Sequence, residues 1–419
     1  MTDTAITLKE SPDTPAETAP LVAGRSAAGA GERNLAVGYL RAFVTVLVVA
    51  HHALIAYRGG LPKTVSFTKP PYAWGAFPVQ DPNTFSPFGL IVGVNDVFFM
   101  SLMFFISGLF VWDGLKRKGA GGFVRNRIVR LGVPFAIAAG VLAPVAYYPA
   151  YLATGADPAI AAYAKAWLSL NAWVAGPAWF IWLLLAFGCI AAGLYKLAPA
   201  WGERLARAFA GGKTRPLVFG AKLLAVSAAA YLALDLVFGP SDWLSWGPFS
   251  VQAARLLHYA AYFAVGIGVG ALPLNDGLLA PDGVLQRRWR SSIALAIVAF
   301  VVATIILIAS GLAAGNTSLG AQAANGVGYT LACAAISLAY LAGFVHFVRK
   351  RSAVWDSLSA NAYGIYLVHY AFVTWIQFAL LRSALPGVSK GLLAFAAALA
   401  LSWAVTAALR RIPLVARVI

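Results

Sequence analysis

Three ionisable side chains, Arg41, His51 and His52, interrupt the first long apolar stretch of the chain, at about residues 35–56. Ionisable groups inside an apolar span are costly, so each indicates a function. In a helix, the eleven residues from Arg41 to His52 turn through roughly 1100°, which leaves both side chains within about 20° of one stripe and about 16.5 Å apart along the axis. His51 projects about 80° to the other side. One face therefore carries a cation near one end and an imidazole deep inside, and imidazole suits proton transfer near neutral pH.

The composition is typical of an integral membrane protein. Hydrophobic residues make up 60% of the 419 residues and charged residues only 11%, and the mean hydropathy is +0.75. A soluble domain with a large core is excluded by these values. The net charge of +17 does not indicate a nucleic-acid partner, because the basic residues cluster between apolar runs, as membrane topology requires. The partner that the composition indicates is a lipid bilayer.

Apolar runs of roughly 17–25 residues, the length that a helix needs to cross the hydrocarbon, recur along the chain. They predict an all-α, polytopic protein of about ten transmembrane helices. The expected spans are 35–56, 92–113, 131–149, 176–195, 217–238, 254–272, 291–313, 323–347, 358–381 and 391–409.

The basic residues alternate between the two sides of these spans. Loops after even-numbered spans, with the C-terminal segment, hold 20 Lys and Arg, and loops after odd-numbered spans hold 6. Since cytoplasmic loops carry the excess of positive charge, both termini are expected in the cytoplasm. Residues 1–34 are rich in Thr, Ala, Pro, Gly and Glu and lack apolar periodicity, which predicts a disordered cytoplasmic tail before a transmembrane domain at 35–419.

Further polar and aromatic side chains lie near the ends of the spans. Arg127 and Arg130 share a helix face at the cytoplasmic surface, where they either bind phosphate groups or only anchor the helix. Trp179 and Trp182 lie near the outer surface, as an aromatic belt or as a platform for a sugar ring. His369 is either a hydrogen-bonded core histidine or part of a site.

Several observations leave alternatives open. Asp96 and Asp235 lie at the outer ends of their spans, and either could orient His52 or pair with Arg255. The long outer loop at 57–91, rich in Pro and aromatics, is a lid, an acceptor surface or a passive connector. The two cysteines give no disulfide framework and no metal-ligand spacing, so no metal is expected.

Five short motifs, taken in order, resemble those of the membrane acyltransferase family 3. They are Leu40-Arg41 with His52 eleven residues after the arginine, Phe104-Phe-Ile-Ser107-Gly108, Arg127-Ile-Val-Arg130-Leu131 followed by Pro134, Trp179-Phe180, and Tyr363-Gly-Ile-Tyr366-Leu-Val-His369. The resemblance covers about residues 35–410. The His51-His52 doublet and the Phe-Phe-Ile-Ser-Gly segment are similar to the branch of the family that modifies glucans. One departure is that many members have Asp two or three residues before the first arginine, where this chain has Gly38 and Tyr39.

The resemblance implies a membrane-embedded O-acyltransferase of the inner (plasma) membrane. It would take an acyl group, acetyl or else succinyl, from cytoplasmic acyl-CoA to a hydroxyl of a carbohydrate or glycolipid. Acyl-CoA would be a co-substrate and not a tightly bound cofactor. Arg41, Arg127 and Arg130 would hold its phosphates, and Trp179, Trp182 and His369 would line the acceptor side. His52 would act as a general base, or it would carry the acyl group as an acyl-imidazole.

The main alternative is a secondary transporter or an exporter of polysaccharide or glycolipid. Ten spans with charges at membrane depth are also typical of that class. Transporters favour inverted repeats and paired broken helices, and neither is evident in the sequence.

Overall fold

The apolar runs form long helices, because a helix satisfies its own backbone hydrogen bonds where lipid offers none. The computed structural model describes residues 1, 35–60, 66–67, 79–170, 173–274 and 276–419. About 75% of the chain is helical. The longer helices are α2 (Leu35–Ile55), α3 (Phe88–Gly108), α4 (Val111–Arg127), α6 (Ala143–Ala153), α8 (Trp179–Leu197), α10 (Pro216–Phe238), α11 (Leu256–Gly270), α13 (Trp289–Ala309), α14 (Leu319–Phe347), α15 (Ala353–Leu380) and α16 (Gly387–Leu409).

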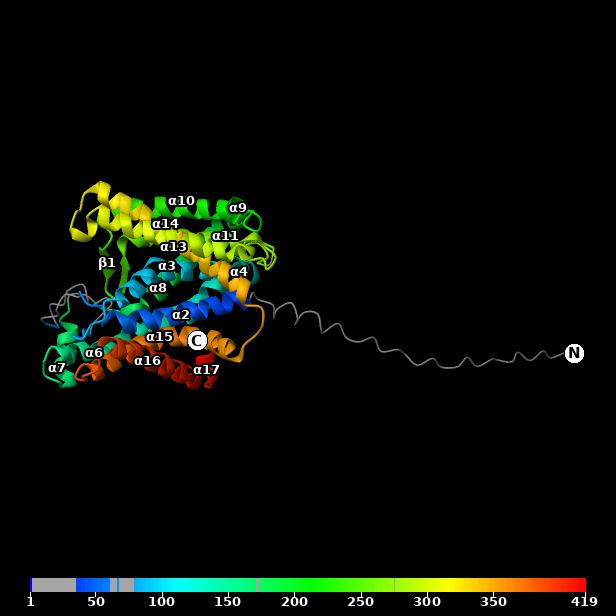
Figure 1. Ribbon diagram of the computed structural model, residues 1–419. Coiled ribbons are helices and arrows are strands. Elements are labelled where there is room, and N and C mark those ends of the chain that lie inside the picture. The colour runs from blue at the N-terminus through cyan, green and yellow to red at the C-terminus, as the bar shows by residue number, and fades with distance from the viewer. Residues whose placement is uncertain (2–34, 61–65, 68–78, 171–172, 275) are drawn as a thin grey trace. The chain divides into compact units, whose positions relative to one another are not determined.

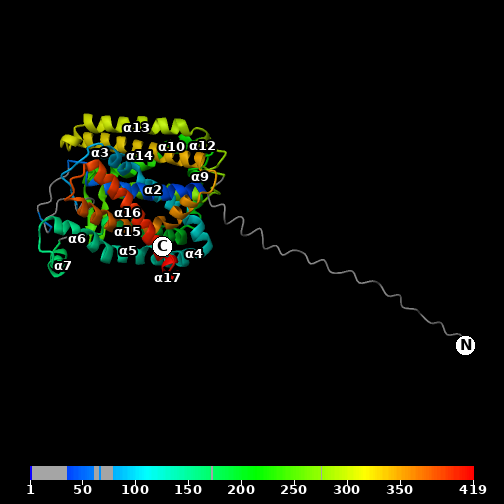
Figure 2. The same cartoon turned by 60° about the horizontal axis from the view of Figure 1, so that its bottom comes forward.

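The long helices run side by side, and the short elements lie at their two ends (Figures 1 and 2). Helix α7 (Ile160–Leu168) and the antiparallel hairpin of β1 (Trp243–Trp246) and β2 (Phe249–Gln252) lie at one end. Helices α9 (Trp201–Ala208), α12 (Val284–Arg287) and α17 (Pro413–Ala416) lie at the other, which is the end rich in Lys and Arg. The expected tail at 1–34, apart from Met1, and most of 57–78 lie outside the described residues.

Nine helices among the described residues are long and apolar enough to cross a membrane. Helix α11 takes the place of the sixth expected span and is shorter, with 15 residues. It packs closely on α3, because Gly108 and Gly266 carry no side chain: a Cβ on Gly266 would come within 2.2 Å of the Phe105 carbonyl oxygen. The expected count of about ten therefore agrees with the structure when α11 is included.

The third span differs from its expected form. Residues 114–130 were expected to form a loop, but helix α4 occupies 111–127 and continues through α5 (Val133–Ile137) into α6. The sequence before Ile128 has no proline to stop a helix, and Gly119, at φ 65°, lets the chain turn between Val111 and the span.

Prolines explain the irregular turns of this third span. Two π-helical segments, Ile128–Gly132 and Ala138–Leu142, precede Pro134 and Pro144, whose missing N–H groups interrupt the α-helical ladder. The carbonyl four residues before a proline loses its hydrogen-bond donor. At two such carbonyls, a side chain of α15 donates instead. Tyr363 Oη donates to the Arg130 carbonyl at 2.8 Å, and Trp375 Nε1 donates to the Val145 carbonyl, four residues before Pro149, at 3.0 Å. Helix α15 is thereby fixed against the third span.

The orientation of the bundle gives a first prediction. Ser241, exposed between α10 and β1, and Thr214, exposed between α9 and α10, lie at opposite ends. In a chain lacking Cys189 and Cys333, Ser241→Cys should react with an impermeant thiol reagent in intact cells, because the basic end faces the cytoplasm. Thr214→Cys should react only after permeabilisation. The opposite labelling pattern would place the arginine-rich end on the outer side and contradict the proposed direction of the reaction.

Candidate active site

His52 lies one helical turn before the outer end of α2, and its partner is a histidine from α15. His52 Nδ1 lies 3.3 Å from His369 Nε2 and 2.9 Å from the Val48 carbonyl oxygen. His369 is fully buried, and its Nδ1 lies 2.6 Å from the Tyr366 carbonyl oxygen. Among the described residues, His52 has no carboxylate partner. His369, and not Asp96 or Asp235, is the side chain placed to orient its ring.

The hydrogen bonds assign the tautomers of this pair. A carbonyl oxygen only accepts, so Nδ1 of each neutral ring must carry the proton. His369 Nε2 then has a lone pair, which can accept from the Nδ1–H group of His52. The remaining nitrogen, His52 Nε2, keeps its lone pair for a reacting group. The arrangement orients one imidazole by means of another, as a base in a catalytic pair or triad is oriented.

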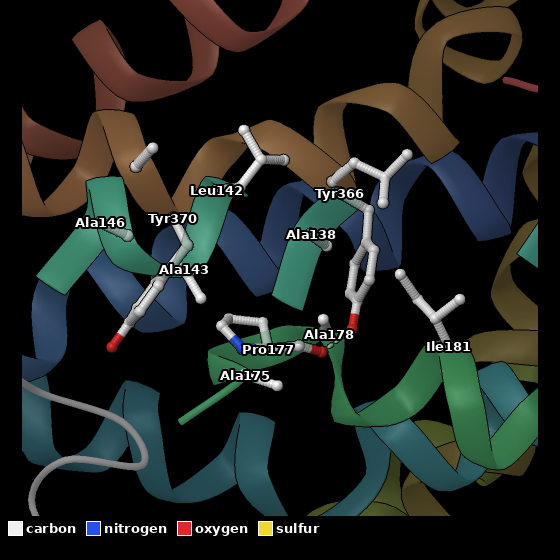
Figure 3. A pocket seen from close by; sticks show the side chains of 12 residues that line it. Ala138, Leu142, Ala143, Ala146, Ala175, Pro177, Ala178, Ile181, Tyr366 and Tyr370 are labelled. Carbon is white, nitrogen blue, oxygen red and sulfur yellow. Dashed lines mark hydrogen bonds between the residues drawn. The ribbon is translucent and has the colours of Figure 1, made fainter. Parts of the chain in front are cut away.

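The surroundings of His52 are mostly closed. Gln377, which is buried, donates from Nε2 to the His52 carbonyl at 2.9 Å and so fixes this turn of α2 to α15. The ring of Tyr370 lies edge-on, with its centroid 5.1 Å from that of His52. A pocket of about 20 Å³, room for about one water molecule, lies beyond Tyr370. In Figure 3, Tyr366 and Tyr370 point from α15 to either side of Pro177 in this pocket.

The other member of the doublet has different neighbours. The His51 ring packs on Phe99 of α3, with 5.1 Å between centroids, and lies 5.3 Å from the ring of His52. It is 7% exposed, and its Nδ1 has no hydrogen-bond partner among the described residues. His51 and His52 therefore face different parts of the bundle, as the helical spacing predicts.

Arg41 lies near the first turns of the same helix, toward the end of the bundle that is rich in Lys and Arg. Its side chain is exposed, and its NH2 group contacts the Ser359 carbonyl oxygen at 3.4 Å. Ser359 Oγ donates to the Gly38 carbonyl at 3.1 Å, and Tyr39 donates to Asp356 at 2.8 Å. The start of α15 thus positions the start of α2, in place of the aspartate that precedes the arginine in many family members.

Arg127 and Arg130 come close to the same helix. The Arg127 guanidinium stacks on Phe123 at 4.9 Å, and Arg130 is exposed with its carbonyl bound by Tyr363. Tyr363 lies one turn after Ser359, so α15 links Arg41 on one side to the arginine pair on the other. The three arginines therefore lie close to the stretch of α15 from Ser359 to Tyr363, about 9–15 Å before His369 along that helix.

Trp179 and Trp182 both contact the outer hairpin. Trp182 Nε1 donates to the Ser250 carbonyl at 3.0 Å, and its ring meets Phe249 edge-on. Trp179 stacks on Tyr259 of α11, with 5.5 Å between centroids, and meets Trp243 edge-on. The indole N–H of Trp182 is therefore engaged by the hairpin, and the two indoles have separate surroundings although they lie three residues apart.

Comparison with known families agrees with this arrangement. The family model described as an acyltransferase domain, acyltransferase family 3, matches residues 34–407, nearly the whole chain. The chain belongs to this acyltransferase family. No curated protein and no solved structure matches the sequence. The protein is thus a multi-pass membrane acyltransferase, and all five motifs identified in its sequence lie inside the matched region.

Two polar centres of the acyltransferase were not assigned from the sequence. Asp96 and Arg255 form a two-pronged ion pair, with NH1 3.0 Å from Oδ1 and NH2 2.5 Å from Oδ2. His258 is fully buried, with Nε2 3.1 Å from Ser101 Oγ, in the interface of α3 and α11. Only the register of α3 against α11 brings these residues together, so the sequence left the partner of Arg255 open.

A larger apolar hollow, of about 850 Å³, lies away from these centres. It is lined by α3, α13, α14 and the beginnings of α2 and α15, and none of the histidines lines it. Its size alone does not make it the active site, because its lining is apolar apart from Lys350 and the hydroxyls of Tyr39, Tyr340 and Ser352.

Proposed function

We propose that this acyltransferase moves an acyl group from cytoplasmic acyl-CoA to a hydroxyl of a cell-envelope or secreted carbohydrate. The observation that carries the proposal is the face of α15 formed by Ser359, Tyr363, Tyr366 and Tyr370, which recur at helical spacing within about 60° of one stripe. At its cytoplasmic end this face contacts Arg41 and the Arg130 backbone, and at its other end Tyr370 contacts His52.

The arginines suit the nucleotide end of acyl-CoA. Its 3′-phosphate and pyrophosphate are anionic, and guanidinium groups bind phosphate with two parallel hydrogen bonds. The phosphopantetheine arm is an extended chain, which would follow α15 inward and bring the thioester toward His52. Enclosure by the bundle would keep water from the thioester.

The transfer step uses the free nitrogen of His52. His52 Nε2 takes the proton of the acceptor hydroxyl as that oxygen attacks the thioester carbon, the C–S bond breaks, and the leaving thiolate recovers the proton. His369 and the Val48 carbonyl hold the opposite side of the ring while it is positively charged. In an acyl-imidazole route, the same Nε2 would instead attack the thioester first.

The apolar surroundings of Tyr370, beside His52, suit an acetyl group better than a succinyl group. Apart from the hydroxyls of two tyrosines, the side chains that line the pocket beyond Tyr370 are apolar, and the space is small. A succinyl group would bring a carboxylate into these surroundings, and burial of a charge without a partner is costly.

The proposal is tested by the release of CoA thiol from acetyl-CoA by vesicles that contain the purified protein. Release should be slow without acceptor and should rise when envelope carbohydrate is supplied on the outer side. A transporter or exporter would move its substrate and leave acetyl-CoA intact. Unchanged acetyl-CoA in the presence of acceptor would therefore exclude the proposed reaction.

The arginine pair gives a second prediction. Arg127→Lys and Arg130→Lys should each weaken acetyl-CoA binding by about tenfold, because a point charge replaces a planar fork and about 1.4 kcal/mol corresponds to a factor of ten. Arg125→Lys is the matched control, since Arg125 is exposed and projects about 200° away from Arg127 on the same helix. Calorimetric titration in nanodiscs measures all three. Equal affinity in every variant would leave the pair only an anchoring role.

A further inference from the structure

The Arg255 guanidinium makes more contacts than its ion pair with Asp96 alone. The Arg255 guanidinium also donates from NH1 to the Asp96 backbone carbonyl at 3.2 Å and lies 5.1 Å from the ring centre of Tyr329. Its side chain is only 11% exposed, whereas the Asp96 side chain is 45% exposed. The arginine is thus held on several sides, and the carboxylate it holds remains open.

The half-exposed Asp96 carboxylate lies well along α3 from its first residue. Asp96 comes eight residues after the outer end of α3, a depth of about 12 Å along the helix. Gly89 and Gly93 lie above it on nearly the same stripe, and a Cβ on either glycine would meet nothing within 4 Å. The exposed Ile91 lies on the opposite face of α3, and the exposed Leu90, about 60° from Gly93, lines the larger apolar hollow. The described residues therefore leave open space beside Gly89 and Gly93, a hollow on the side of α3 that carries Asp96.

An unused hydrogen-bonding atom lies beside this hollow. The His51 ring packs on Phe99, which lies three residues after Asp96 on the same face of α3, with 5.1 Å between ring centroids. His51 is more than nine-tenths buried, yet its Nδ1 has no partner among the described residues. In the neutral tautomer that carries its proton on Nε2, the ring keeps a lone pair on Nδ1, which can accept a hydrogen bond from a hydroxyl.

Aromatic rings flank the same region. Tyr259, four residues after Arg255 on α11, carries Trp179 stacked on its face, and Trp243 of the hairpin meets Trp179 edge-on. Carbohydrate rings have apolar faces that suit aromatic side chains, and hydroxyls at their rims that suit a carboxylate and a guanidinium.

We propose that Asp96 and Arg255, with the free Nδ1 of His51, form the subsite that binds the acceptor carbohydrate, reached from the outer side along Gly89 and Gly93. The carboxylate and His51 would accept hydrogen bonds from two sugar hydroxyls. Since the rings of His51 and His52 lie 5.3 Å apart, a neighbouring hydroxyl comes within reach of His52 Nε2. This inference rests on the proposed function and names the residues that select its acceptor.

A plug in the hollow tests the inference without breaking the ion pair. Gly93→Leu fills the open space, and leucine is favoured over glycine in a helix by roughly 1 kcal/mol, so the variant should fold. Gly193→Leu on α8 is the matched control, because Gly193 is also helical, exposed and free of neighbours within 4 Å. The readouts are alkali-released acetate from envelope carbohydrate of expressing cells and the affinity of the purified protein for acetyl-CoA.

Gly93→Leu should lower the released acetate at least tenfold and leave the acetyl-CoA affinity within twofold, and Gly193→Leu should match the wild type in both. Asp96→Asn, which keeps the side-chain shape, should lower the acetate in the same way. Near-normal acetate in Gly93→Leu would overturn the inference and leave the ion pair a purely structural role. Failure of the proposed function is a different result, in which wild-type cells show no more carbohydrate-bound acetate than the empty host.

Discussion

Replacing His52 with alanine should lower acyl transfer by about a thousandfold or more, because general-base catalysis contributes roughly 10²–10⁴ in rate and an acyl-imidazole route would be lost entirely. Acetyl-CoA affinity should stay near the wild-type value, since Arg41, Arg127 and Arg130 are untouched. Acylated carbohydrate formed per minute by membranes at equal protein level measures the loss.

Two other histidines serve as comparisons for this variant. His346→Ala, at the cytoplasmic end where the ring contacts Gln286, should have little effect. His51→Ala should cost about tenfold, through weaker acceptor binding and not through the chemical step. If His51→Ala abolished transfer while His52→Ala remained nearly normal, the assignment of the catalytic imidazole would be wrong.

The second large effect is expected at His369. His369→Ala removes the side-chain acceptor of the His52 Nδ1–H group and leaves only the Val48 carbonyl, and loss of such an orienting partner typically costs 10–100-fold. The loss should appear in kcat, with KM for acetyl-CoA little changed. His369→Gln offers a carbonyl oxygen in place of Nε2 and should recover most of the activity.

A purely structural role for His369 predicts another pattern. Both variants would then lose thermal stability and activity together, and the glutamine would rescue neither. A rise in KM for the carbohydrate acceptor as large as the loss in kcat would instead return His369 to the acceptor-binding role that the family resemblance implies.

The sequence alone was sufficient for features that depend on local periodicity. Arg41 and His52 share one helix, so their spacing fixes their relation. Apolar runs locate most of the spans within a few residues, including 254–272, where α11 is a shorter helix of 15 residues. The sequence predicts a loop at 114–130, where helix α4 lies, because the six Lys and Arg of this segment are typical of a connector between spans.

Contacts between distant segments could not be predicted in this way. His52 and His369 are 317 residues apart, and only the packing of α2 on α15 brings them to 3.3 Å. The pairing of Asp96 with Arg255 depends on the close approach of α3 and α11 at Gly108 and Gly266. One contact between distant segments did leave a trace in the sequence. Pro134 frees the Arg130 carbonyl, which indicates that a donor from another helix binds it.

The central claim is that His52 transfers an acyl group from CoA to a carbohydrate. The most direct measurement supplies acetyl-CoA labelled in its acetyl group to inside-out membrane vesicles and follows the label into carbohydrate. Wild-type vesicles should place the label on carbohydrate as an alkali-labile ester, and His52→Ala vesicles should not. Labelled carbohydrate at equal levels in both vesicles, or intact acetyl-CoA with carbohydrate merely moved across the wild-type membrane, would contradict the account.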